Sequence, residues 1–360
     1  MNPYADLPGR NFWSPAVGKR NALDIDELWL PKWEVTAKDK VVTFGSCFAQ
    51  HFGRALLERG YNWTNMEPPP AGLGEVGIDR FNYRVFSART GNIYSTNILR
   101  QWCDWATGRA MPPDEVWEAA GRFYDPIRPA IEPNGFESPQ EMRDSRDLTI
   151  RAFGDAIRKS DVFVFTLGLT ESWRHADLSY EYALCPGTVA GEFDPKSHVF
   201  VNETYPNITN SLELALATMH EINPALRVLL TVSPVPLTAT ATNDHVLVAT
   251  TYSKSVLRAV AGDVAAKNRL VDYFPSYEII TAPVYGGRFF AENKRSVLSE
   301  GVAHVMTQFF KGQVGKFGEA EVAPDAGMEK GADNPKTTSL QSNDDLVCEE
   351  SILAAFGPKV

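Results

Sequence analysis

The residues best suited to chemistry lie in one stretch, Lys40 to Tyr61, where a serine follows a short apolar run. Val41 to Phe44 is apolar and β-branched, Gly45 and Ser46 interrupt the pattern, and from Cys47 onward apolar residues recur at helical spacing. Strand, tight turn and helix together present a small polar side chain at the carboxyl edge of a sheet, beside the positive end of a helix. The pattern indicates nucleophilic or anion-binding chemistry at Ser46, although an ordinary N-capping serine explains it equally well.

The six residues Phe44 to Ala49 read FGSCFA. This run resembles the signature of the GSCFA-domain family, which is grouped with the SGNH/GDSL hydrolases. The resemblance implies that Ser46 is the nucleophile of an acyl-transfer reaction and that its own backbone N–H is one oxyanion donor. Gly45 and Cys47 would then lie beside the substrate.

Two later segments resemble the blocks that complete the oxyanion hole in SGNH relatives. Gly91 resembles the second-block glycine, and Asn92 follows it; a simple turn glycine is the alternative. Gly168, Thr170 and Glu171 follow the clearest predicted strand and take the place of Gly-x-Asn-Asp, with threonine instead of asparagine. Each oxyanion donor contributes roughly 3 kcal/mol to transition-state stabilisation, and threonine lacks the reach of an amide. Glu171 has a structural alternative as a capping or ion-paired residue.

The base that would activate the serine is where this chain departs from the family pattern. The family implies a late Asp-x-x-His, but Asn293 and Ser296 stand at those two places and cannot act as such a pair. Two other histidines are candidates. His51 lies five residues after Ser46, and His245 lies on the loop after a later strand. That no histidine serves is a third possibility.

The elements that must position these residues alternate between strand and helix. Short, continuous apolar runs are typical of parallel strands that are buried on both faces. Four such runs separated by helical patterns predict an α/β fold with a doubly wound, mostly parallel sheet, whose sites lie at the carboxyl ends of the strands. This agrees with the three-layer fold that the resemblance implies. The predicted strands are Val41–Phe44, Asp161–Leu167, Arg227–Val232 and Leu270–Pro275.

Composition shifts divide the chain into three segments. Residues 1–38 are rich in proline and aromatic side chains and predict an irregular arm, and residues 39–310 contain the SGNH-like domain. Two proline- and turn-rich insertions, at about 105–147 and 177–205, are expected to shape the substrate side of the site. Residues 311–360 lack periodicity, are acidic, and predict a disordered tail.

The overall composition excludes several classes of function. A formal net charge of -10 without a basic stripe argues against nucleic-acid binding. No long apolar window predicts a membrane span, no leader pattern is present, and four scattered cysteines fit a reducing cytoplasm. No metal motif or dinucleotide-binding glycine pattern occurs, so we expect neither a metal nor another cofactor. The oligomeric state cannot be read from the sequence.

Three classes of function remain. The first is serine-dependent acyl transfer, by an esterase or by an acyltransferase acting on a glycan or another hydroxyl, so that the expected partner is a small ester, acyl or glycan substrate. The second is a ligand-binding module on an SGNH scaffold that has lost hydrolysis, which the replaced Asp-x-x-His favours. The third is a scaffold protein that docks partners through its arm and tail. Fold analogy alone does not choose among them.

Overall fold

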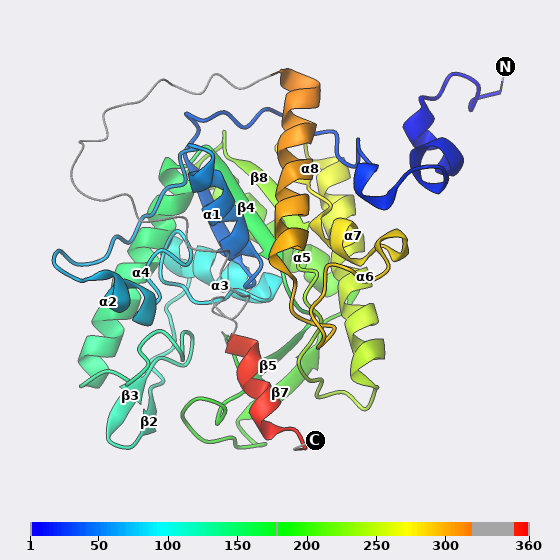
Figure 1. Cartoon of the computed structure of the whole chain (residues 1–360). Coiled ribbons are helices and arrows are strands. Elements are labelled where there is room, and N and C mark those ends of the chain that lie inside the picture. Colours follow the sequence, from blue (N-terminus) through cyan, green and yellow to red (C-terminus); the bar gives the residue numbers. More distant parts are fainter. Residues whose placement is uncertain (1, 178, 319–348, 359–360) are drawn as a thin grey trace. The chain divides into compact units, whose positions relative to one another are not determined.

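The computed structural model describes residues 2–177, 179–318 and 349–358, which belong to two compact units. We call Lys38–Tyr273 with Leu346–Val360 the sheet unit, and Met1–Ala37 with Phe274–Asp345 the terminal unit. Figure 1 shows the course of the chain through both. The candidate nucleophile and the central sheet lie in the sheet unit.

The central sheet has four parallel strands in the order β1-β4-β8-β9. Their side chains are almost entirely buried, because a parallel sheet is covered on both faces. The four predicted strands are therefore confirmed, each within two residues of its expected bounds. The strands are β1 (Val41–Gly45), β4 (Val162–Leu167), β8 (Arg227–Val232) and β9 (Val271–Tyr273).

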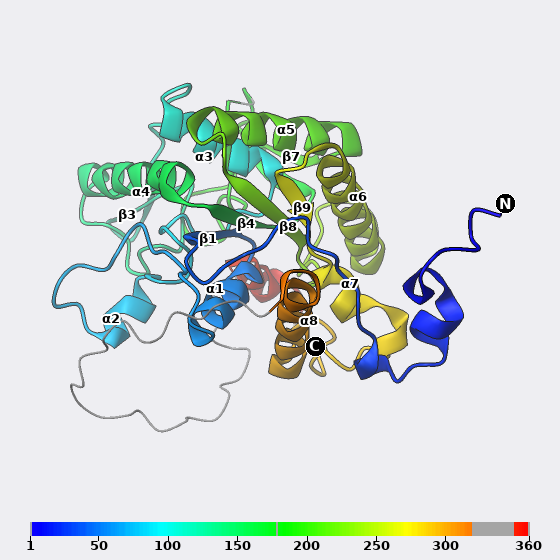
Figure 2. The same ribbon diagram turned by 90° about the horizontal axis from the view of Figure 1, so that it is seen from above.

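Helices cover both faces of this sheet, as a doubly wound α/β fold requires. Figure 2 shows α1 (Ala49–Glu58) on one face and α3 (Thr96–Thr107), α4 (Pro139–Lys159) and α5 (Tyr205–Ile222) on the other. α6 (Val246–Lys267) packs along β8 and β9, and α2 (Glu75–Arg80) is a short helix between α1 and α3. The predicted three-layer α/β class is confirmed.

The two predicted insertions contain regular structure. The first includes the hairpin of β2 (Trp117–Ala119) and β3 (Arg122–Tyr124), and it ends earlier than expected because α4 begins at Pro139. The Ser138 hydroxyl caps α4 by accepting a hydrogen bond from the Glu141 N–H at 3.1 Å. In the second, β6 (Glu181–Tyr182) and β7 (His198–Asn202) flank β5 (Glu171–His175) in a small antiparallel sheet.

The terminal unit joins the N-terminal arm to two helices near the other end of the chain. These are α7 (Ser276–Thr281) and α8 (Ser299–Phe317). Trp29 stacks on Phe309 with ring centroids 5.2 Å apart, and the Gln308 amide donates to the Ile25 carbonyl at 2.9 Å. Short helical turns occur at Gly9–Asn11, Ser14–Gly18, Ala22–Asp24 and Pro283–Tyr285.

The predicted disordered tail began too early. α8 continues to Phe317, seven residues beyond the expected domain end at 310, because Gln313 faces inward and its amide oxygen accepts from the Val35 N–H at 3.0 Å. Residues 319–348 lie outside the described residues. Beyond them, Glu349–Phe356 forms a short 3-10 helix that belongs to the sheet unit. Within the described ranges, no helix combines the length and apolar character that crossing a membrane requires.

Candidate functional site

Three backbone segments meet where β1 and β4 end. The Gly45 carbonyl accepts a hydrogen bond from the Ile93 N–H at 2.9 Å, and the Tyr94 carbonyl accepts from the Gly168 N–H at 3.0 Å. A Cβ placed on Gly168 would lie only 3.2 Å from the Ser46 Cβ. The segments around Ser46, Gly91 and Gly168, which the sequence places far apart, are therefore neighbours at one edge of the sheet.

The turn at Ser46 depends on the glycine before it. Gly45 has a φ of 123°, and a Cβ there would lie 2.3 Å from the Thr166 carbonyl oxygen, so only glycine fits. Ser46 is 2% exposed, and its Oγ has no hydrogen-bond partner within the described part of the chain. Burying an unpaired hydroxyl costs about 1–3 kcal/mol. The capping interpretation is wrong, because α1 begins only at Ala49 and has no side-chain cap.

Several expected oxyanion donors are already used inside the fold. The Ser46 N–H donates to the Thr166 carbonyl at 3.0 Å, which extends the β1–β4 ladder by one residue. The Thr170 hydroxyl donates to Asn202 Oδ1 at 2.7 Å, and its N–H donates to Ser253 Oγ at 3.1 Å. The Ser46 N–H and both donors of Thr170 are therefore engaged in hydrogen bonds within the fold in this structure.

Gly91 keeps an N–H that the fold does not use. It is buried and has a φ of 67°, and among the described residues none accepts a hydrogen bond from its N–H. The backbone just before it is held from both sides. The Arg89 N–H donates to Glu67 Oε2 at 2.8 Å, and Arg128 Nη1 donates to the Arg89 carbonyl at 3.3 Å. These contacts fix the direction in which the Gly91 loop leaves.

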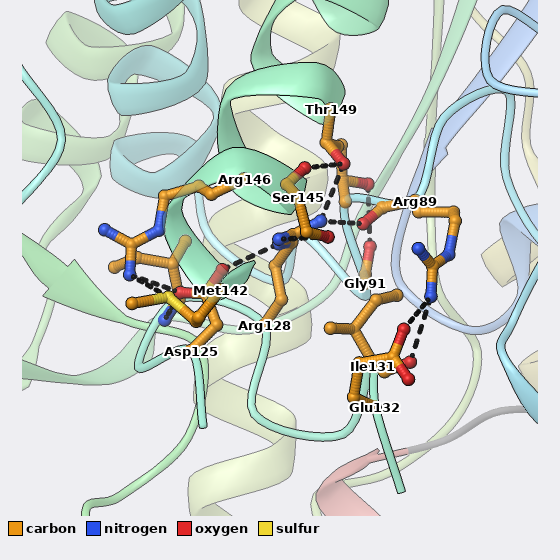
Figure 3. A network of polar contacts seen from close by, with 12 residues as sticks. Arg89, Gly91, Asp125, Arg128, Ile131, Glu132, Met142, Ser145, Arg146 and Thr149 are labelled. Carbon is orange, nitrogen blue, oxygen red and sulfur yellow. Dashed lines mark hydrogen bonds and ion pairs between the residues drawn. The ribbon is translucent and has the colours of Figure 1, made fainter. Parts of the chain in front are cut away.

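The arginine that holds this loop belongs to a buried ionic cluster, shown in Figure 3. Asp125 accepts from Arg128 Nε at 2.8 Å and pairs with Arg146 Nη2 at 2.7 Å, and all three side chains are at most 2% exposed. Burial alone would raise the pKa of Asp125, but the two guanidinium groups outweigh it and hold the pKa below its ordinary value. The first insertion therefore supports the loop before Gly91 through the bond from Arg128 to the Arg89 carbonyl. Its turn-rich sequence did not indicate this role.

Comparison with known protein families gives a match that includes all three of these segments. A model of the GSCFA family matches residues 40–309, which include the segments around Ser46, Gly91 and Gly168. The chain belongs to the GSCFA family. No match to it occurs among the curated proteins or the solved structures.

Two histidines of this GSCFA-family chain were predicted as candidate bases, and they differ in their surroundings. His51 lies on α1 with its ring edge-on to Phe48 at 5.4 Å, and its Nε2 has no partner among the described residues. Burial, with a smaller contribution from Arg54, lowers its pKa to about 4, so the ring is neutral at pH 7. His245 is exposed and caps α6, because its Nδ1 accepts from the Leu247 N–H at 3.1 Å.

The Asp-x-x-His position of this GSCFA-family chain forms a self-contained turn in the terminal unit. The Asn293 amide donates to Ser296 Oγ at 2.9 Å, and the Ser296 N–H donates back to Asn293 Oδ1 at 2.9 Å. Both residues therefore satisfy each other. Among the described residues, no group of three or more His, Cys, Asp or Glu side chains is arranged to hold a metal ion.

Sequence reasoning missed Lys254. This lysine of α6 is 1% exposed, and its Nζ donates to the Gly168 carbonyl at 2.7 Å. Gly168 lies next to Ser46, so the hydrogen bond from Lys254 helps to fix the backbone beside the candidate nucleophile. The available signal was a lysine within the core-facing stripe of a largely apolar helix, next to Leu257 and Val260.

Glu171, which follows β4, borders a cavity. Its carboxylate accepts from Thr240 Oγ1 at 2.6 Å and from the Ala241 N–H at 3.2 Å. Burial raises its pKa despite these hydrogen bonds. The cavity has a volume of about 700 Å³ and is bounded by Tyr94 and Leu169 as well as by Glu171. Among the residues that the structure describes, Glu171 therefore caps no helix and forms no ion pair, and it borders a space large enough for a ligand.

Proposed function

We propose that this GSCFA-family protein catalyses serine-dependent acyl transfer on an SGNH-like fold, with Ser46 as the nucleophile. It acts as an esterase, or as an acyltransferase toward the hydroxyl of a glycan or of another small acceptor. The observation that carries the proposal is the Ser46 hydroxyl, which lies buried at the carboxyl edge of the sheet and has no hydrogen-bond partner among the described residues. Several buried hydroxyl groups of the described residues are unpaired, but Ser46 is the one that follows β1 directly at the carboxyl edge of the parallel sheet, where ligands of α/β proteins bind.

The proposed reaction uses the groups that the fold leaves available. Ser46 Oγ attacks the carbonyl carbon of the ester, and the carbonyl oxygen becomes an oxyanion. The Gly91 N–H is the donor for that oxyanion. The ester C–O bond breaks, the leaving oxygen takes up the proton that Ser46 gave to the base, and the alcohol leaves while the acyl group stays on Ser46. Water or an acceptor hydroxyl then gives its proton to the same base, attacks the acyl carbon and releases Ser46, which takes the proton back.

The Ser46 proton needs an acceptor, and His51 is the better of the two predicted histidines. Its ring is neutral at pH 7 and its Nε2 is unpaired, whereas Nδ1 of His245 is occupied by the helix cap. Lys254 is a positioning residue: through its bond to the Gly168 carbonyl it keeps that glycine against Ser46.

Labelling with a fluorophosphonate probe tests whether Ser46 is activated. Wild-type protein should be labelled, and Ser46→Ala should abolish the label. Ser160→Ala is a matched control, because Ser160 is also buried but lies at the end of α4, where its Oγ donates to the Ala156 carbonyl. This control should be labelled as the wild type is. Well-folded wild-type protein that takes up no label would refute an activated serine.

A second function, ligand binding without turnover, has its own support. The Asn293–Ser296 turn supplies no acid–base pair, and the Thr170 hydroxyl is committed to Asn202. Under this second function, a small ester or sugar ligand binds with equal affinity to the wild type and to Ser46→Ala. The ligand is recovered unchanged from both proteins. Release of alcohol by the wild type alone would exclude it.

A further inference from the structure

The cavity that Glu171 borders is lined mainly by apolar and aromatic side chains. It lies entirely in the sheet unit and is enclosed by the β4–β5 turn, by β5 to β7 with their loops, and by the 237–241 loop. Leu353 and Phe356 of the C-terminal 3-10 helix complete the wall. Tyr94 lines it and also lies 3.1 Å from where a Cβ on Gly168 would be, as the Ser46 Cβ does at 3.2 Å. Tyr94, which lines the cavity, and Ser46, which does not, are therefore both close to Gly168.

Aromatic rings dominate the far wall. Trp173 packs edge-on against Phe193, with ring centroids 5.2 Å apart, and tilted against Phe200 at 5.4 Å. Tyr94 and Tyr182 add two more rings to the lining. Flat aromatic surfaces of this kind bind the apolar face of a ligand without requiring any charge on it.

The charges around the cavity have one sign. The lining residues that the structure describes include two carboxylates, Glu171 and Glu192, and no lysine, arginine or histidine. Arg174 follows Trp173 on β5 but is paired with Glu181, at 3.0 Å, and with Glu203. An anionic ligand that entered would lose its hydration without gaining a cation, and it would also face Glu171.

We propose that this cavity is the substrate subsite for an uncharged, hydroxyl-bearing ligand with an apolar face, such as a sugar ring with an alkyl or acyl group, and that Glu171 excludes anions from it. That the bound ligand is a substrate rests on the proposed acyl-transfer function. Binding of the ligand does not require Ser46 to be reactive. Thr240 and Ala241 hold the Glu171 carboxylate in place, and the lone pairs that they leave accept ligand hydroxyl groups.

Three probes with the same six-carbon chain and different charge test this assignment: hexyl β-D-glucoside, hexanoate and hexylammonium. Their affinities are measured by calorimetry below micellar concentrations, on full-length Ser46→Ala, so that turnover does not interfere. The glucoside should bind, and hexanoate should bind at least roughly tenfold more weakly. Glu171→Gln should reduce that preference to within roughly threefold, and Trp173→Ala should weaken the glucoside.

Glu192→Gln is the matched control, because it removes the same charge from an exposed carboxylate at the rim. It should leave the preference within twofold of its original value. Hexanoate binding as tightly as the glucoside would overturn the proposal, as would hexylammonium binding more tightly than both. Absence of binding by all three probes would overturn it too. Each of these results is independent of fluorophosphonate labelling at Ser46, so the failure of one proposal is distinguishable from the failure of the other.

Discussion

Replacing His51 by phenylalanine should remove a pH dependence of stability that the buried imidazole creates. His51 has a pKa of about 4 in the folded protein against an ordinary value of 6.5, chiefly because burial disfavours the charged ring. Between these two values the unfolded chain binds a proton that the folded protein does not. His51 therefore leaves stability undiminished above about pH 6.5, and stability falls as the pH drops from there toward 4.

The magnitude follows from 1.36 kcal/mol per pKa unit. At pH 5 the wild type should have lost about 2 kcal/mol through His51, and at pH 4 about 3 kcal/mol. His51→Phe keeps a ring against Phe48 but cannot titrate, so acid effects from other groups cancel in the difference between the two proteins. The free energy of unfolding is measured from urea titrations at pH 7.5, 6, 5 and 4.5.

The advantage of wild type over His51→Phe should shrink by about 2 kcal/mol between pH 7.5 and 5. Leu57→Phe is the control, because this exposed position on the same helix carries no titratable group in either protein, so its difference from the wild type should not change with pH. A His51→Phe difference that does not change with pH would refute the reasoning. If His51 also accepts the Ser46 proton, the rate of fluorophosphonate labelling should fall as the pH drops through about 4, since the protonated ring cannot act as a base.

Three other perturbations have defined outcomes. Asp125→Asn leaves two buried guanidinium groups without their carboxylate and should cost about 3–5 kcal/mol of unfolding free energy. The control Asp155→Asn breaks an exposed ion pair and should cost less than about 1 kcal/mol. Equal costs would contradict a structural role for the cluster. Gly45→Ala places a Cβ 2.3 Å from a carbonyl oxygen at a φ of 123°, so the midpoint of thermal unfolding should drop by several degrees or no folded protein should be recovered; an unchanged midpoint would contradict the close approach. Lys254→Met keeps the volume of the buried lysine but loses its hydrogen bond to the Gly168 carbonyl. It should slow fluorophosphonate labelling at least roughly tenfold while the circular dichroism spectrum stays native. Labelling at the wild-type rate would show that Lys254 does not position the site.

The central sheet could be predicted from the sequence because each of its strands lies in a short, mostly apolar run. Val162 to Leu167 is buried at every position, and no other element type explains so short and uniform a run. β5 was not predicted, since Glu171 to His175 is polar or aromatic throughout and becomes a strand only by pairing with β6 and β7. Its strand propensity depends on partners that are distant in the sequence.

The site was predicted in part. The resemblance named Ser46, Gly91 and Gly168, and the fold does bring their segments together. What the sequence could not reveal is which donors the fold consumes: the Ser46 N–H is taken by a neighbouring strand, and the Thr170 hydroxyl is taken by a side chain 32 residues away. Such commitments arise from tertiary packing, and a one-dimensional pattern carries no record of them.

The terminal unit has a consequence for biosynthesis. Its first part, residues 1–37, leaves the ribosome before all of residues 38–273, and its second part begins only at Phe274. At about 5–20 residues per second, the arm waits on the order of ten to fifty seconds for the helices against which it packs. During that interval Trp29 and Ile25 lack Phe309 and Gln308, so the nascent chain carries an uncovered aromatic segment while residues 38–273, the larger part of the sheet unit, are synthesised. The arm is therefore the part of this protein for which a chaperone that binds short apolar segments has the longest opportunity during translation.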